Sequence, residues 1–247
     1  MKKEYAVLSD IHGNSWALKA VLEDIRTKGI SNFINLGDIF YGPLDPAGTA
    51  EVLDKYPMDA VQGNEDRLIY EIPGNKLANT TLEYVVRQLS EGEINWLRHL
   101  PKTKIVDRKI FLCHGTPDND TEYLLEGIQN ELVTFRSKKA IEMSVKDIDC
   151  PVIACGHSHV AKTFRMRDGR MIVNAGSVGL PAYSDDAPRF HKMEAGSPHA
   201  SYVLLKEKDK GWDFEFVKVA YDWEKAAEQA EENDRQDWAQ WLRTGRA

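Results

Sequence analysis

The sequence has little cysteine, no basic surplus and no long apolar run. Its 247 residues include only Cys113, Cys150 and Cys155, an odd number without the CxxC spacing of a redox or zinc site. We therefore expect buried free thiols in a reducing compartment. The net charge of −7 argues against a general nucleic-acid binder, which would carry a basic stripe. Part of the acidic excess is explained if bound cations neutralise carboxylates.

A Pro/Gly/Ser-rich linker, an internal repeat and a low-complexity tract are also missing. With 42% hydrophobic residues, the chain is long enough for one large domain or two small ones. The missing linker favours a single domain over residues 1–247. No 18-residue apolar stretch occurs, and no apolar segment precedes the first expected strand, so we expect no membrane association and a cytoplasmic location.

The chain is organised around the hexapeptide Ser9–Asn14. The apolar run 5–8 before it predicts a buried strand, and the helical spacing of apolar residues after it predicts an amphipathic helix. Asp10 and His12 therefore lie at a strand-to-helix turn, where each can give a metal ion one ligand. Taken alone, such a motif is more often an ordinary polar turn than a metal site.

Four further predicted strands end in the same kind of residue. They lead into Asp38, Asn64, His114, and the pair His157 and His159. Because ligands of open α/β sheets collect beyond the carboxyl ends of the strands, we expect these side chains to converge. Two carboxylates, one amide oxygen and four imidazoles suit Mn, Fe, Zn or Co, and are too rich in nitrogen for Ca or Mg. Seven ligands are too many for one tetrahedral ion and fit two ions if a carboxylate bridges them.

Apolar periodicity and turn residues predict the other elements. Helices are expected over 15–28, 47–53, 80–89, 91–100 and 223–242, with further helical segments from about 122 to 146. Hairpins are expected over 164–173 and 201–219. Trp238, Trp241 and Leu242 are interpreted as the face by which the terminal helix docks, with a dimer contact as the alternative. The polar segment 183–198 is expected to be either a lid or a disordered insertion.

Five motifs, in this order and roughly at this spacing, resemble the calcineurin-like metallophosphoesterase superfamily, in its compact bacterial and archaeal phosphodiesterase-like branch. They are Asp10-x-His12, Gly37-Asp38, Gly63-Asn64, His114-Gly115 and Gly156-His157-x-His159, with Asn174–Gly179 near the end. The resemblance implies an α/β fold: a four-layer α/β/β/α sandwich with mixed sheets and a C-terminal helix. The catalytic motifs would span 5–180, followed by strands and a helix over 200–247.

The same resemblance implies how the metal ligands are shared. Asp10, His12 and His159 would hold one ion. Asn64, His114 and His157 would hold the second, and Asp38 would bridge the two. Mn is the first choice, with Fe, Zn, Co or Ni as alternatives. Such a pair activates water for attack on phosphorus. The expected catalytic residues are Asp38, Asn64, Glu65 and His114.

The implied activity is that of a metal-dependent phosphoesterase, with phosphodiester hydrolysis in first place. Hydrolysis of a dinucleoside polyphosphate such as diadenosine tetraphosphate is the first alternative, and a phosphomonoester or protein phosphatase the second. A metal-binding scaffold without activity, like the retromer subunit that looks similar to this family, is the non-enzyme alternative. The expected partner is a small phosphorylated compound, with nucleotides included, and a homo-oligomer is left open.

The sequence departs from the family pattern at Glu65, where the family commonly has a histidine that helps to protonate the leaving group. The aspartate that partners this histidine in protein phosphatases is replaced by Tyr41. Glu65 acts as the acid, or a metal-bound water does, or only substrates with good leaving groups react. A structural pairing of Glu65 with a nearby arginine is the fourth option. Asn14, Tyr41 and Arg67 are expected to line the substrate mouth.

Overall fold

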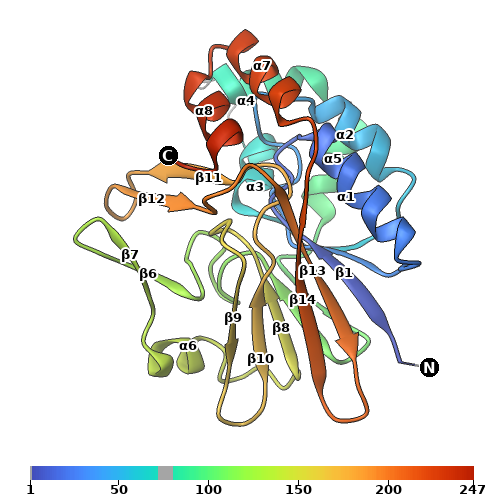
Figure 1. The fold of residues 1–247 in the computed structure, drawn as a ribbon, viewed down its shortest axis with the longest axis vertical. Coiled ribbons are helices and arrows are strands. Elements are labelled where there is room, and N and C mark those ends of the chain that lie inside the picture. Colours follow the sequence, from blue (N-terminus) through green and yellow to red (C-terminus); the bar gives the residue numbers. More distant parts are fainter. Residues whose placement is uncertain (1, 72–79) are drawn as a thin grey trace.

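The computed structural model describes residues 2–71 and 80–247, which form two five-stranded mixed sheets with surrounding helices (Figure 1). In the first sheet the strands β1, β2 and β3 run parallel, and β13 and β14 extend it antiparallel beside β1. Its bounds are β1 (Glu4–Leu8), β2 (Phe33–Asn35), β3 (Asp59–Ala60), β13 (Ala200–Glu207) and β14 (Trp212–Val219), in the order β14-β13-β1-β2-β3.

The second sheet carries the remaining motif strands. Here β5, β8 and β10 are parallel, and β4 and β9 close the two edges antiparallel. The bounds are β4 (Thr103–Val106), β5 (Ile110–Cys113), β8 (Val152–Cys155), β9 (Lys162–Arg165) and β10 (Met171–Asn174), in the order β4-β5-β8-β10-β9. The two sheets share one apolar core, in which Val7 and Ile34 of the first sheet cluster with Leu112 and Ala154 of the second.

Most helices gather on one side of the molecule, on the outer face of the first sheet (Figure 1). The sequence explains how they start: Asn14 caps the first helix by accepting from the amide of Ala17, and Ser90 and Glu93 form the expected capping box. The helices are α1 (Ser15–Thr27), α2 (Pro46–Leu53), α3 (Asn64–Glu71), α4 (Thr80–Gln88), α5 (Glu91–His99), α7 (Trp223–Glu232) and α8 (Gln236–Thr244). The predicted mixed α/β class is confirmed.

The outer face of the second sheet is covered by a short helix, α6 (Lys138–Ser144), through Ile141. The expectation of helical segments from about 122 onward is wrong for the part before this helix. Residues there form a hairpin of β6 (Glu126–Gln129) and β7 (Leu132–Phe135). Asn130 and Glu131 adopt the left-handed conformation that a two-residue hairpin turn requires.

Two expectations about the C-terminal region also need correction. The segment 183–198 is neither a disordered insertion nor an unstructured loop, because it contains the hairpin β11 (Ala182–Asp185) and β12 (His191–Glu194). The terminal helix is broken in two at Asp234, which has a positive φ of 58° and so cannot continue the helix. Trp238, Trp241 and Leu242 of α8 are buried in the core, as the docking interpretation predicts. No helix of the described residues is both long and apolar enough to cross a bilayer.

Candidate metal centre

Residues that follow β1, β2, β5 and β8 meet in two separate groups of potential metal ligands, and a third group, of His12, Asp38 and Glu65, overlaps both. In each group one ligand atom of every member lies within 4.8 Å of those of the others. Asp10, His12 and His159 form the first group, and Asp38, His114 and His157 form the second. All six residues are buried. The strands of both sheets thus aim their carboxyl ends at one place.

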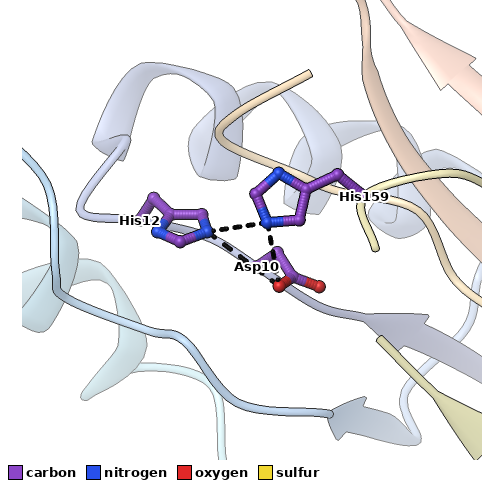
Figure 2. A group of neighbouring side chains, drawn as sticks. All are labelled: Asp10, His12 and His159. Atoms are coloured by element: carbon purple, nitrogen blue, oxygen red, sulfur yellow. Dashed lines mark hydrogen bonds and ion pairs between the residues drawn. The ribbon is translucent and has the colours of Figure 1, made fainter. Parts of the chain in front are cut away.

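In the first group, ring nitrogens of His12 and His159 face one another and the carboxylate of Asp10 (Figure 2). Nδ1 of His12 lies 2.9 Å from the carbonyl oxygen of Tyr41, and Nδ1 of His159 lies 2.6 Å from that of Leu180. A carbonyl only accepts hydrogen bonds, so each Nδ1 carries a proton. As neutral imidazoles, the two rings present the lone pairs of their Nε2 atoms, 3.0 Å apart, to each other. Although burial acts in the opposite direction, Glu65 raises the pKa of His12 to about 9, so a cation would replace a proton at this Nε2.

An orphaned carboxylate oxygen completes this group. Among the described residues, Oδ1 of Asp10 is buried without a hydrogen-bond partner, and it lies 3.2 Å from Nε2 of His159. Three lone-pair donors at such distances repel one another unless a cation or a proton lies between them. Histidine ligands commonly donate their second ring N–H to a carbonyl, as both histidines do here. The residues therefore fit a divalent metal ion.

The second group repeats this pattern at one histidine. Nδ1 of His114 lies 2.8 Å from the carbonyl oxygen of Leu36. Its Nε2 lies 3.0 Å from the side-chain oxygen of Asn64 and 3.2 Å from Oδ2 of Asp38. Asn64, which begins α3 after β3, is thus brought to the second group as the sequence predicts. All seven expected ligand residues lie at this centre.

His157 is held differently. Within the part of the chain that the structure describes, neither of its ring nitrogens has a hydrogen-bond partner, and its ring instead stacks on Tyr123 with 4.7 Å between centroids and 24° between planes. The Tyr123 hydroxyl lies 2.8 Å from both the hydroxyl of Tyr183 and Nε2 of His191. Tyr183 in turn donates to the backbone carbonyl of His157. No sequence pattern indicated this support, because its members come from a loop and from both strands of the β11–β12 hairpin.

Comparison with known proteins agrees with this geometry. Residues 4–206 match the calcineurin-like phosphoesterase superfamily domain. The chain belongs to this superfamily. An uncharacterized protein of Methanocaldococcus jannaschii is 27% identical over 96% of both chains.

Two solved structures share the fold of this superfamily member. A metallophosphoesterase from Sphaerobacter thermophilus is 23% identical and superposes with a TM-score of 0.76. The alignment covers 99% of this chain and 100% of that protein's chain. A hypothetical protein from Pyrococcus horikoshii is 20% identical, covers 98% of both chains and has a TM-score of 0.72. These likenesses extend over the C-terminal strands and helices, beyond the region that matches the superfamily domain.

The superfamily motifs place their ligands on a strained backbone. Asp10, His12, Asp38, His157 and His159 all have positive φ, between 51° and 67°. For residues other than glycine this conformation is sparsely populated and costs on the order of 1 kcal/mol or more each. The strain aims consecutive ligands at the same point as the chain leaves each strand.

The glycines of the motifs allow the strand ends to approach one another. A Cβ at Gly63 would lie 2.1 Å from Oδ1 of Asp38, and one at Gly156 would lie 2.7 Å from Oδ2 of Asp10. Real Cβ atoms do not come this close, so both positions require glycine. The Gly-Asn and Gly-His pairs in the sequence thus reflect contacts between motifs that are far apart in the chain.

Asp66 links the segments that follow β2 and β3 by hydrogen bonds, a role that the sequence did not indicate. Its buried carboxylate accepts from the amides of Asp38, Ile39 and Gly63, at 2.8, 2.8 and 3.0 Å. The amide of Glu65, at the start of α3, donates to Oδ1 of Asp38 at 2.9 Å. The positive end of α3 therefore stabilises the Asp38 carboxylate.

The pKa shifts keep Asp38 and His157 in their metal-binding forms, whereas, although burial acts in the opposite direction, Asp38 raises the pKa of His114 to about 10. Burial alone would raise the pKa of Asp38, but His114 and His12 outweigh burial and lower it. Burial, reinforced by the charge of His114, lowers the pKa of His157 to about 4. At neutral pH Asp38 is therefore a carboxylate and His157 a neutral imidazole, as metal ligation requires.

A cavity of about 280 Å³ opens over the centre. Tyr41 and Glu65 line it, as expected for substrate-facing residues. Oε2 of Glu65 lies 3.2 Å from Nδ1 of His12, and no arginine of the described residues pairs with it, so that structural option is wrong. Burial raises the pKa of Glu65 to about 7, with a further contribution from Asp38, while the contact with His12 acts in the opposite direction.

Two expected substrate residues lie elsewhere. Asn14 is fully buried, where its side chain caps α1 and donates to the carbonyl of Gly179 and the hydroxyl of Tyr221. Arg67 forms ion pairs with Asp120 and Glu71 beside a second polar cavity, which His114 also lines. Asn14 does not face the cavity over the centre, because nearness in sequence to a ligand does not fix the direction of a side chain, and a substrate-binding role of Arg67 stays a prediction. The structure places other residues at the cavity instead, namely Leu180, Tyr183, Ser184, Asp185, Arg235, Trp238 and Trp241.

Proposed function

We propose that this protein is a phosphodiesterase that works with two divalent cations, with manganese as the first choice. The observation that carries the proposal is the convergence of lone pairs from Asp10, His12 and His159 in a member of the calcineurin-like phosphoesterase superfamily. Two bound cations would supply Lewis acidity, which acidifies water and neutralises charge on phosphoryl oxygens. Asp38 lies beside ligands of both groups and is the carboxylate that would be shared.

The charge of the cavity wall supports a diester over a monoester. Asp185 and Glu65 line the cavity along with the ligands. Arg235 is the one Lys or Arg side chain among its described lining residues, and Asp237 neutralises it with two hydrogen bonds. A phosphodiester carries one negative charge and a monoester close to two, so the acidic wall repels the diester less.

The size of the cavity argues against protein and large nucleotide substrates. At about 280 Å³ it is at the small end of ligand pockets, which are roughly 300–1,000 Å³. It accommodates one phosphoryl group and one substituent. Dinucleoside polyphosphates and phosphoproteins would leave most of their bulk outside it.

A substrate panel tests the proposal. The manganese-loaded protein should hydrolyse bis-p-nitrophenyl phosphate with a kcat/KM at least about tenfold above those for p-nitrophenyl phosphate and diadenosine tetraphosphate; tenfold corresponds to about 1.4 kcal/mol in the barrier. The protein after chelation of metal is the control. A preference for the monoester or the tetraphosphate would replace the diesterase assignment. Absence of hydrolysis with two ions bound per chain would support the scaffold alternative.

A further inference from the structure

One side of the cavity over the metal centre is aromatic. We call Tyr183 of β11 together with Trp238 and Trp241 of α8 the aromatic wall. These residues lie outside every motif that carries a ligand, and α8 contacts β11 directly. The wall adjoins the first group, because the ring of Trp238 lies edge-on to His12 at 5.7 Å and that of Tyr183 edge-on to His159 at 4.5 Å.

The break between α7 and α8 belongs to the construction of the wall. Asn233 donates from its side chain to the carbonyl of Pro43, in the loop after the second motif, and Asp234 reverses the backbone. The guanidinium of Arg235 then lies over the ring of Trp238, 5.3 Å from its centroid, and is fixed by Thr81 and Asp237. Trp238 is thus held by neighbours on several sides.

Trp241 and Tyr183 offer the accessible part of the wall. Trp241 retains 8% exposure, against 3% for Trp238, which lies 6.3 Å away at an angle of 40°. Tyr183 is partly buried and is held by hydrogen bonds to Tyr123 and to the backbone of His157. Apolar ring surface therefore stands next to a group of charged and polar metal ligands, within one small cavity.

We propose that the aromatic wall is a substrate subsite that binds a planar, uncharged ring attached to the phosphoryl group. The inference rests on the proposed phosphodiesterase function and names its substrate class: phosphodiesters with one aryl or heteroaromatic substituent. Aromatic side chains bind flat rings through stacked or edge-to-face contacts, with little cost in side-chain entropy. An alkyl substituent of the same charge would gain less from the wall.

Packing of α8 against the body is the purely structural explanation of the same tryptophans. A structural role would make the loss of Trp241 affect all ligands alike. A subsite discriminates between ligands that differ only in the ring. The test therefore compares two non-hydrolysable probes of the manganese-loaded full chain, phenylphosphonate and methylphosphonate, by titration calorimetry.

Wild-type protein should bind phenylphosphonate at least about tenfold more tightly, since stacking on an aromatic side chain adds to the affinity for a flat ring. Trp241→Leu, which keeps an apolar side chain at this position, should lower that affinity about tenfold and alter methylphosphonate affinity by less than about twofold. Trp241→Phe should retain most of the preference. Trp96→Leu, at an exposed tryptophan that lines a different cavity, is the matched control and should behave as wild type.

Equal affinity of the wild-type protein for the two phosphonates would overturn the subsite, and this comparison needs no variant to fold. Equal losses for both probes in Trp241→Leu would also overturn it, as would failure of both probes to bind. The proposed function is judged separately by hydrolysis of p-nitrophenyl phenyl phosphate and p-nitrophenyl methyl phosphate. A ring preference in binding without hydrolysis of either ester keeps the subsite and removes the diesterase. Hydrolysis of both esters at equal kcat/KM, together with equal affinities for the two phosphonates, would keep the diesterase and remove the subsite.

Discussion

The two ligand groups differ in what holds their histidines. In the first group, His12 and His159 are both fixed by hydrogen bonds to backbone carbonyls. In the second group, only His114 is held in this way, whereas His157 is held by stacking on Tyr123. A carbonyl within the fold orients a ligand wherever the backbone forms. A stacked ring does so only if a loop and the β11–β12 hairpin are also in place.

This difference implies that the first group is preformed by the fold and that the second depends on distant side chains. The support of His157 runs through Tyr123 to Tyr183 and His191, on the two strands of the hairpin. Tyr183 also belongs to the aromatic wall. The hairpin thus links the second ligand group to the cavity over the centre, and three variants test how far the two groups can be separated.

Replacing the carboxylate beside both groups should have the largest effect. Asp38→Asn preserves the size of the side chain, and asparagine also tolerates the positive φ at this position. The substitution removes the negative charge that lies 3.2 Å from Nε2 of His114. We expect loss of one bound ion and a fall in kcat/KM of at least about a thousandfold, which is about 4 kcal/mol. Metal content and hydrolysis of bis-p-nitrophenyl phosphate are the measurements.

The matched control is Asp147→Asn, since the side chain of Asp147 is 87% exposed. It should keep both ions and full activity. If Asp38→Asn retained two ions and lost less than about tenfold in kcat/KM, Asp38 would not be the shared ligand, and the two groups would act as independent sites.

Removal of the stacked ring should weaken one group and spare the other. Loss of an outer-shell partner of a metal ligand typically costs about 10–100-fold in metal affinity. Tyr123→Leu should therefore weaken the second binding step of a manganese titration by this factor and leave the first step unchanged. Tyr123→Phe, which keeps the ring, should lose much less.

Tyr56→Leu, on the wall of another cavity, controls for loss of a tyrosine in general. Equal weakening of both steps by Tyr123→Leu would show that the groups are not supported separately. Equal effects of the Leu and Phe variants would assign the support to the hydroxyl rather than to the ring.

The smallest effect is expected for Glu126→Gln, on stability. Glu126 lies beside the loop 156–159, which supplies one histidine to each group. Glu126 is buried beside Ser158 of this loop, and burial raises its pKa although Nζ of Lys162 lies 3.0 Å away. Because the native pKa exceeds the unfolded value, the wild type loses stability as the pH rises through the native pKa. Glu126→Gln avoids that loss and should be more stable at pH 8, by no more than about 2 kcal/mol.

The advantage of Glu126→Gln should vanish below pH 4.5, the ordinary pKa of the side chain, where both states of the wild type are protonated. Urea unfolding at several pH values, on protein freed of metal, is the measurement. Glu228→Gln, at an exposed position of α7, is the control. A stability difference independent of pH would mean that ionisation of Glu126 does not couple to folding.

Local chemistry made much of the fold predictable. Asn14 and Ser90 cap the helices that follow them, and Asp168-Gly169 turns the hairpin of β9 and β10, because these contacts span a few residues. The wrong expectations concern segments whose structure depends on distant partners. Tyr183 is held by Tyr123, 60 residues away, and Asn233 by the carbonyl of Pro43, 190 residues away. No short sequence window contains such pairs.

By itself, the sequence identified the residues that meet at the candidate metal centre. Each ligand follows an apolar strand beside a small residue, and parallel strands bring such ends together whatever the loops between them do. Only the tertiary structure decided what surrounds the ligands: the stacking of Tyr123 on His157, the hydrogen bonds of Asp66 and the aromatic wall. These depend on side-chain directions across long loops, which are settled by packing rather than by any local pattern.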